Sequence, residues 1–345
     1  LPLVLHAFAK IDFRYEPILN AVCDALLKVH PADWQPTAVA STTFSLARLN
    51  FRHKLADELW STHVARKVHD MSVREVINCA FAMLLADCDP PCPERSQFVS
   101  KRSKSSRPEK SHSSNEFDVN STSDVIQNDI RKGERPEGLN SDLLLTLVRT
   151  AARKAKACGV KGSQGKSLTA LPPSTAHQVA ILCAALSHSS CMSEQLRPCT
   201  KSLSAEVLDF LRWSRDAEKV IKHSIYSSKL QTRLEKVLKA FESGKWESEY
   251  EARPYRLDWA APRQKLAIEV DGFKHFYAMT RDPTAKTQLK ARILEAMGWS
   301  VVALPYYELQ RQPKEEVKRF LAAKFEAVAG TNWRKRFVPD VPRAF

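Results

Sequence analysis

The chain has 345 residues, 43% of them hydrophobic, and a formal net charge of +14 at pH 7. Because this length exceeds what one core usually serves, two or three folding units are expected. The excess of Lys and Arg favours a polyanionic partner, nucleic acid rather than a membrane. No apolar stretch approaches the roughly 18 to 20 residues of a membrane-spanning helix, which disfavours an integral membrane protein.

The eight cysteines are scattered along the chain, and Cys23, Cys79 and Cys183 lie within apolar helical patterns. This placement predicts buried free thiols in a reducing compartment rather than a disulfide framework. A zinc site is disfavoured because the two nearest cysteines are separated by Asp-Pro-Pro and lack the knuckle spacing of such sites. The residues that could be imagined for it are Cys88, Cys92, His188, Cys191 and Cys199.

Residues 1–88 show a repeated helical pattern. The segment AFAKIDFR at 7–14 returns as SLARLNFR at 45–52, and a third apolar segment, AFAML, begins at Ala80. From Ala9 to Ala47 is 38 positions and from Ala47 to Ala82 is 35, a period typical of helix-pair solenoids. Ser72, three residues before Glu75, predicts a capping box and therefore a helix start. We therefore predict an all-α helical-repeat solenoid over residues 1–88.

The repeat array is expected to be interrupted and then to resume. Residues 89–140 begin as a Ser-, Lys- and Arg-rich tract with almost nothing apolar, which predicts a disordered basic insertion. This insertion could be a solvated linker or a basic tract that becomes ordered on RNA. Residues 141–227 regain helical spacing and predict helical hairpins that continue the array.

A solenoid places equivalent side chains in register along one face. Lys10 and Arg48 would then form one pair of basic positions and Arg14 and Arg52 another, so the array could follow a phosphate backbone. An ordinary solvated face is the alternative for these four side chains. The sequence leaves both interpretations open.

A small α/β domain is predicted over residues 228–328, where the hydrophobic period changes. The predicted elements are, in order, a helix at 228–244, strands at 249–261 and 265–272 joined by the turn 262–264, a helix at 284–298, a strand at 299–309 and a helix at 314–330. Residues 329–345 are a basic tail, which could dock on RNA or protein or simply solubilise the chain.

Two motifs of this domain, YRLDWAAPRQKLAIEVDGFKHFY and ILEAMGWSVVALPYYEL, resemble the RAP domain. That domain is named for RNA-binding proteins abundant in apicomplexans and also ends the FAST kinase family. The resemblance covers roughly residues 228–325, and the upstream repeats resemble the helical repeats that usually accompany the domain. It implies a fold similar to restriction endonucleases of the PD-(D/E)XK type, residence in mitochondria or plastids, and work on organellar RNA.

The implied fold raises a choice between a nuclease and a binding protein. A nuclease of this type needs two carboxylates to hold Mg²⁺ and a lysine two positions after the second. Asp258 and Glu269 stand where the carboxylates belong, but the lysine position is Asp271, so catalysis is disfavoured. Lys274 or His275 could replace the lysine. In the alternative, Asp271 caps a turn and Glu269 pairs with a nearby basic residue.

Without hydrolysis the same pocket would suit an RNA end or a bent backbone. Basic and aromatic side chains around it are predicted to contact RNA, although about half of the aromatic ones are expected to be packing residues. The predicted contacts are Lys274, His275, Tyr277, Lys286, Lys290, Arg292 and Tyr306, with Phe273 and Tyr307 as further stacking faces.

The charge and the missing lysine predict an RNA-binding protein without a cofactor, and the resemblance implies a mitochondrial location, with a plastid as the alternative. The protein would act on ribosomal RNA or transcripts beside ribosomal or other ribonucleoprotein proteins, or as a component of the mitochondrial ribosome, and not on a membrane. The chain opens at Leu1, so we expect a targeting peptide to have been cleaved or left out. Two alternatives stay open: a Mg²⁺-dependent endonuclease using Asp258, Glu269 and Asp271, and a helical scaffold for partner proteins.

Overall fold

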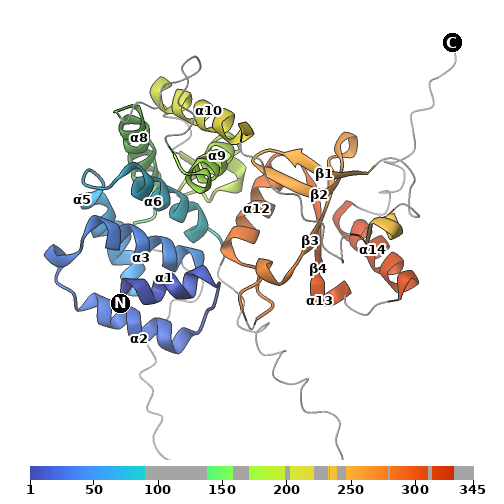
Figure 1. The fold of residues 1–345 in the computed structure, drawn as a ribbon, viewed down its shortest axis with the longest axis horizontal. Coiled ribbons are helices and arrows are strands. Elements are labelled where there is room, and N and C mark those ends of the chain that lie inside the picture. Colours follow the sequence, from blue (N-terminus) through green and yellow to red (C-terminus); the bar gives the residue numbers. More distant parts are fainter. Residues whose placement is uncertain are drawn as a thin grey trace, which may run out of the picture.

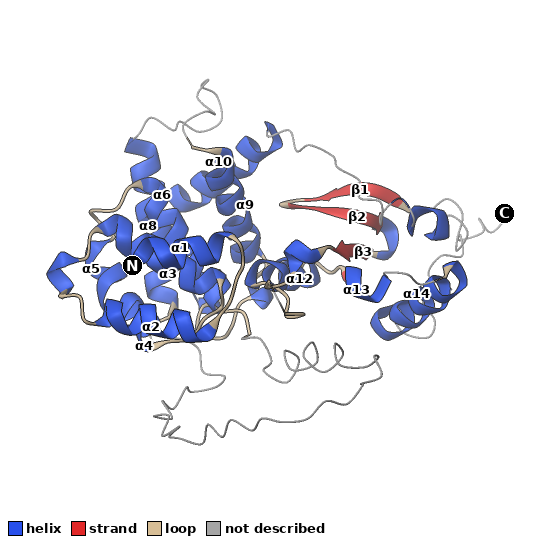
Figure 2. Cartoon of the chain, turned by 60° about the horizontal axis from the view of Figure 1, so that its bottom comes forward, coloured by secondary structure: helices blue, strands red, loops and turns tan. Residues whose placement is uncertain are grey.

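The computed structural model describes residues 1–89, 138–157, 171–198, 203–220, 232, 234–238, 246–278, 280–309 and 313–329. In these residues a helical unit is followed by a four-stranded sheet flanked by helices (Figures 1 and 2). Most of the predicted insertion at 89–140 and of the predicted tail at 329–345 lies outside the described residues. The same holds for the helix predicted over 228–244, of which Thr232 and residues 234–238 are described and helical.

The helical unit contains the elements from α1 to α10. They are α1 (Pro2–Lys10), α2 (Glu16–Leu27), η1 (Pro31–Asp33), α3 (Pro36–Arg48), α4 (Lys54–Glu58), the π-helix η2 (Leu59–Val64), α5 (Ala65–Lys67), α6 (Val73–Ala86), α8 (Ser141–Ala157), α9 (Pro173–Ser187), η3 (Ser189–Cys191) and α10 (Ala205–Val220). Helix α1 packs on α3, α3 packs on α6, and α6 packs on both α8 and α9. The helical content confirms the prediction of an all-α first part, whereas the solenoid arrangement stays a prediction.

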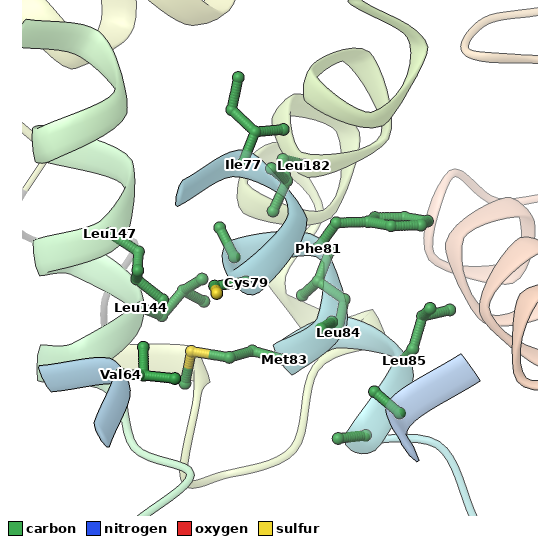
Figure 3. Close-up of a cluster of buried hydrophobic side chains, with 14 of the residues drawn as sticks. Val64, Ile77, Cys79, Phe81, Met83, Leu84, Leu85, Leu144, Leu147 and Leu182 are labelled. Carbon is green, nitrogen blue, oxygen red and sulfur yellow. The ribbon is translucent and has the colours of Figure 1, made fainter. Parts of the chain in front are cut away.

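Helix α6 lies at the centre of the helical unit. The predicted capping box is present at its start, where Glu75 N donates to the Ser72 hydroxyl and Ser72 N donates to the Glu75 carboxylate. Figure 3 shows side chains of α6 pointing to several neighbours, with Cys79 beside Leu144 of α8 and Ile77 beside Leu182 of α9. Because its residues are buried almost all round, α6 acts as the core of this unit.

The described cysteines are free, as the sequence predicted: Cys23, Cys79, Cys88, Cys183 and Cys191. Burial raises the pKa of the Cys88 thiol to about 12, so this side chain is an inert packing group. In the part of the chain that the structure covers, no three His, Cys, Asp or Glu residues are grouped so as to hold a metal ion. None of its helices is long and apolar enough to span a membrane.

The sequence repeat has a backbone counterpart at the ends of α1 and α3. Asp12 and Asn50 occupy equivalent positions and adopt left-handed φ values of 52° and 47°. Phe13 N then donates to Phe8 O at 3.0 Å, and Phe51 N makes the same kind of bond to Leu46 O, also at 3.0 Å. Asp and Asn are the non-glycine residues that best tolerate this conformation. The repeat therefore encodes the way in which each helix ends.

The sheet has the order β1-β2-β3-β4, with antiparallel pairs β1–β2 and β2–β3 and a parallel pair β3–β4. Its strands and helices are β1 (Glu247–Ala252), β2 (Tyr255–Ala261), η5 (Pro262–Gln264), β3 (Leu266–Asp271), η6 (Phe273–His275), α12 (Ala285–Ala296), β4 (Ser300–Pro305), α13 (Tyr306–Leu309) and α14 (Lys314–Ala329). Every residue of β3 is buried, so this strand is the centre of the sheet.

Two predicted strands need correction. The strand predicted over 249–261 is a hairpin of β1 and β2, because Pro254 has no N–H for the ladder and the chain turns there. The strand predicted over 299–309 ends at Pro305, after which Tyr306–Leu309 forms a helical turn. The other predicted elements of this domain that the structure describes agree with it to within a few residues.

Helices cover both faces of the sheet. On one face, Leu321 and Phe325 of α14 pack with Leu234 and Leu238 against Ile268. The other face is covered by α12, whose Leu294 packs with Leu257, Ala267 and Trp299. The opposite side of α12 belongs to the core of the helical unit, through Ala285, Leu289 and Ile293. Helix α12 therefore lies between the sheet and the helical unit, as Figure 1 shows.

Candidate nucleic-acid interface

Two of the predicted pocket carboxylates lie together on the neighbouring strands β2 and β3. The register Trp259↔Ile268 places Asp258 next to Glu269. Asp258 Oδ2 accepts a hydrogen bond from Val270 N at 2.7 Å, so part of this carboxylate is used to fix the two strands to each other. The structure thus brings Asp258 and Glu269 together from positions eleven residues apart in the sequence.

Glu269 is buried and paired with a lysine of α12. Lys290 Nζ lies 2.6 Å from Glu269 Oε2 and also donates to Arg256 O at 3.2 Å. Only 8% of the Glu269 side chain is exposed. Burial raises the pKa of Glu269 from its ordinary 4.5 to about 7, although the Lys290 ammonium acts in the opposite direction. Glu269 thus has the nearby basic partner that was expected if its role is structural.

Asp271 is used to hold the turn that follows β3. Its Oδ1 lies 3.0 Å from His275 Nδ1. His275 N donates to Gly272 O at 2.9 Å, and His275 O accepts from Thr284 N and from the Thr287 hydroxyl. These bonds fix η6 and the side chains that it presents.

Each of the three carboxylates has a protein partner, which leaves fewer oxygens for a Mg²⁺ ion of the nuclease type, although Glu269 Oε1 is buried without a hydrogen-bond partner among the described residues. Asp258 binds a backbone N–H, Glu269 binds an ammonium, and Asp271 binds an imidazole. A Mg²⁺ ion needs carboxylate oxygens directed at one point. The Lys290 ammonium instead supplies the positive charge beside the buried Glu269 carboxylate.

The basic residues predicted to track phosphates along the helical unit mostly serve internal contacts. Arg48 donates to both carboxylate oxygens of Asp12, at 2.8 and 2.9 Å, and thereby fastens α3 to the end of α1. Arg52 donates to Cys88 O at 2.8 Å, which fastens the end of α3 to the end of α6. Arg14 pairs with Glu16 at 3.0 Å. Lys10 is exposed at the end of α1.

Tyr277 and Arg292 hold the sheet domain on the helical unit. Tyr277 was predicted at the surface, but 1% of it is exposed. Its hydroxyl donates to Arg48 O and accepts from Ala285 N, each at 3.0 Å. Arg292 donates to Asp87 Oδ2 at 2.8 Å and to Asp87 O at 2.9 Å. Both side chains are therefore structural ties in this fold, and neither presents a free surface for RNA.

Asp87 is a residue whose role sequence reasoning missed. It follows the apolar helix α6 directly and is 1% exposed. Besides Arg292, it accepts a hydrogen bond from Ser193 N at 3.0 Å. The signal that could have found it is the acidic residue directly after the apolar run 79–86 of α6, since a carboxylate in that place needs a cationic partner.

The exposed cations gather on residues 272–286, which we call the basic loop. It connects β3 with the first turn of α12 and runs beside the helical unit, where Ala278 N donates to Asp12 O at 2.8 Å. Lys274, Arg281 and Lys286 are exposed. The Arg281 guanidinium lies 4.6 Å from the ring centre of Tyr307. Arg281 was absent from the predicted contacts.

The cations of the basic loop form no ion pair with a described carboxylate, although Asp12 acts on Lys286 from beyond ion-pair distance. No Asp or Glu of the residues that the structure covers lies within ion-pair distance of Lys274, Arg281 or Lys286. Lys286 reaches solvent, yet the atoms packed around it, and then Arg48, lower its pKa to about 8. The predicted contact His275 is half-buried beside them, and Tyr306 packs edge-on against Tyr307. The basic loop is therefore the part of the predicted site that stays open to a polyanion.

Comparison with known proteins identifies the domain that carries this loop. A family model described as the RAP domain matches residues 268–324, from within β3 into α14. A RAP domain-containing protein from Oryza sativa subsp. japonica, named as chloroplastic, is 36% identical to this chain over 63 residues. The aligned stretch covers 18% of this chain and 10% of that relative's length. The chain thus carries a C-terminal RAP domain, as its strand motifs predicted.

Proposed function

We propose that this protein binds RNA through the exposed edge of the basic loop and does not cut it. The observation that carries the proposal is that the acidic side chains of the pocket are paired within the protein, whereas the exposed basic side chains described on the basic loop are not. Its carboxylates at the nuclease-like position are engaged by protein groups, whereas Lys274, Arg281 and Lys286 lack carboxylate partners among the described residues. Lys and Arg side chains of this kind bind phosphates through counterion release.

The sheet topology supports the proposal that the pocket derives from a nuclease-like fold. Three antiparallel strands followed by a parallel β4, with α12 between β3 and β4, suit a fold like that of PD-(D/E)XK restriction endonucleases. On this proposal the RAP domain keeps the carboxylate positions of such a fold but uses them for stability. The helical unit, proposed to be a solenoid, would extend the RNA surface from Lys10.

The proposed subcellular location is an organelle, and the proposed ligand is an organellar ribosomal RNA or transcript. The name of the rice relative favours a plastid, while the mitochondrion was the first expectation from the sequence. A role as a component of the mitochondrial ribosome, beside ribosomal proteins, belongs to the same proposal. Imaging of the tagged full-length protein with markers for both organelles distinguishes a plastid location from a mitochondrial one.

Salt-dependent RNA binding tests the proposal. Labelled single-stranded RNA is titrated with the protein at increasing KCl, and the affinity is expected to fall steeply as salt rises. Combined substitution of Lys274, Arg281 and Lys286 by Ala should flatten the log–log slope by about two, since each phosphate contact to a single strand contributes about 0.7. The matched control replaces three exposed cations of the helical unit, Lys28, Lys54 and Arg66. Affinity that hardly changes with salt would contradict the proposal.

A cleavage assay tests the part of the proposal that excludes catalysis. Labelled RNA and DNA are incubated with the protein and Mg²⁺ or Mn²⁺, in parallel with Glu269→Gln. We expect binding without cutting, unchanged by a chelator. Metal-dependent cutting that is lost in Glu269→Gln would show that the pocket is a nuclease site instead.

A further inference from the structure

The exposed ring of Phe273 is the feature of the RAP domain that packing does not explain. Its exposed fraction is 70%, the largest among the aromatic side chains that the structure describes. Its neighbours in the basic loop behave differently, since Phe276 and Tyr277 are 7% and 1% exposed. A phenyl ring in water loses the free energy that burial would provide. The ring is therefore available to a partner.

The backbone that carries Phe273 is held firmly. Phe273 begins η6, directly after the buried strand β3 and Gly272. The next turn is fixed by the Asp271–His275 contact and by the two hydrogen bonds that His275 O accepts from Thr284 and Thr287. A ring on such a support loses little conformational entropy when a ligand stacks on it.

The surroundings of Phe273 are cationic rather than apolar. Lys274 Nζ lies 5.9 Å from the centre of the Phe273 ring, and Arg281 lies further along the same loop. No other large apolar side chain of the described part of the basic loop is exposed. A protein-docking site or a membrane-binding site would need a wider apolar patch. One aromatic face beside cations instead matches sites for single-stranded nucleic acid, in which bases stack and phosphates pair with Lys and Arg.

We propose that Phe273 stacks on an unpaired base of single-stranded RNA, while Lys274 and Arg281 bind neighbouring phosphates. This inference rests on the proposed RNA binding and specifies the substrate class, which is unpaired RNA without a fixed sequence. A base inside an A-form helix is already stacked between its neighbours and cannot offer its face to Phe273. The site therefore discriminates single strands from duplexes.

Substitutions at position 273 separate stacking from general apolar contact. The affinity for a labelled single-stranded 12-mer is measured by fluorescence anisotropy for the parent, Phe273→Ala, Phe273→Leu and Phe273→Tyr. Because stacking on one aromatic ring contributes about 1–3 kcal/mol per base, the Kd of Phe273→Ala should rise roughly 5- to 150-fold. Phe273→Leu should lose nearly as much, and Phe273→Tyr should bind like the parent. Equal affinities of the Leu and Tyr variants would overturn the stacking role.

Two further arms test the geometry of the proposal. A 2-aminopurine base in the oligonucleotide should lose fluorescence when the parent binds, and much less when Phe273→Ala binds at saturation. A long RNA duplex should bind parent and Phe273→Ala with nearly the same affinity, because every base except those at its two ends is already stacked on both faces. An equal loss of affinity for the duplex would overturn the preference for unpaired bases.

The parent protein separates this inference from the proposed function. If the parent shows no salt-dependent RNA affinity, the proposed function fails and the inference fails with it. If the parent binds RNA and Phe273→Ala binds equally well, the inference alone is wrong. Circular dichroism of each variant should match the parent, since a residue exposed by 70% contributes little packing.

Discussion

Glu269 should make the stability of the protein depend on pH in the range below neutrality. Burial raises its pKa from 4.5 to about 7 in the folded chain. Between these values the folded state binds more protons than the unfolded state, so the stability falls as pH rises through this window and levels off above it. The free energy of unfolding of Glu269→Gln relative to the parent should therefore rise by on the order of 3 kcal/mol from pH 4.5 to 7.5. Urea denaturation at several pH values measures it, and a constant difference would contradict the raised pKa.

Lys290 should matter most when Glu269 is ionised. Lys290→Met removes the ammonium 2.6 Å from Glu269 Oε2 and leaves a buried carboxylate without a counterion. Loss of one partner of a buried pair costs about 3–5 kcal/mol, and a well-packed neutral pair recovers much of that. We expect a large loss of stability for Lys290→Met at pH 8, a smaller one at pH 5, and recovery in Lys290→Met/Glu269→Gln.

The control for this pair is Lys318→Met. Lys318 pairs with Glu315 at 2.9 Å, but the Glu315 side chain is 69% exposed, so the substitution should cost less than about 1 kcal/mol. Urea denaturation of Lys290→Met, Lys290→Met/Glu269→Gln and Lys318→Met beside the parent gives the comparison. A Lys290→Met variant that lost no more stability than Lys318→Met would show that Glu269 is not buried as an ionised group.

At the residue scale, the sequence predicted the location of the pocket side chains better than it predicted their roles. The spacing and the family motif predicted that Asp258 and Glu269 meet across two strands, and they do. The internal roles of Tyr277 and Arg292 could not be predicted, because their partners Arg48 and Asp87 lie 229 and 205 positions away in the sequence. The sequence of a motif does not distinguish a basic or aromatic residue that faces RNA from one that packs against another domain.

Helix α12 should depend on its N-terminal cap. The Thr284 hydroxyl accepts a hydrogen bond from Thr287 N at 3.3 Å, and Thr284 is 3% exposed. Thr284→Ala leaves this backbone donor without its partner and should lower the free energy of unfolding by about 1 kcal/mol, whereas Thr284→Ser keeps the hydroxyl and should lose less. Thermal unfolding of the three proteins compares them. Equal melting temperatures for Ala and Ser would show that the hydroxyl does not stabilise α12.

At the element scale, long periodic helices were predictable and short strands were not. The pattern and the Ser72 cap predicted the start of α6, since a cap and an apolar period act together over several turns. The sequence predicted one strand in place of the β1–β2 hairpin, because the turn at Arg253-Pro254 lacks the Gly or Asn by which hairpin turns are recognised. Pro254 was the available signal against a continuous strand.

At the scale of the whole molecule, the RAP domain and the helical unit share one core. Leu289 and Ile293 of α12 pack with residues of the helical unit, together with the buried ring of Tyr277. Cys88 Sγ also lies 3.5 Å from Ala285 O across this junction. Separation of the two parts would expose these apolar side chains to water, which is unfavourable. The basic loop, which lies along the junction, is therefore held in a fixed position relative to the helical unit.

This shared core predicts that the two parts unfold together and that Arg292 couples them. Asp87 is 1% exposed and receives hydrogen bonds from Arg292 and Ser193 N. Arg292→Met leaves the Asp87 carboxylate buried without its cation, which should cost about 3–5 kcal/mol. Asp87→Asn/Arg292→Met removes both charges and should recover part of this loss.

Hydrogen exchange across a urea series measures this coupling. In the parent, amides of β3 and of α6 should lose protection at the same urea concentration, because neither part is stable once the junction opens. In Arg292→Met both sets of amides should lose protection together at a lower urea concentration, because the buried Asp87 carboxylate has lost the Arg292 cation. The control is Arg212→Met, whose partner Asp209 has a side chain 73% exposed, and it should leave both transitions at the urea concentration of the parent. Separate transitions in the parent would show that the RAP domain is an independent unit, and the fixed placement of the basic loop beside the helical unit would then be wrong.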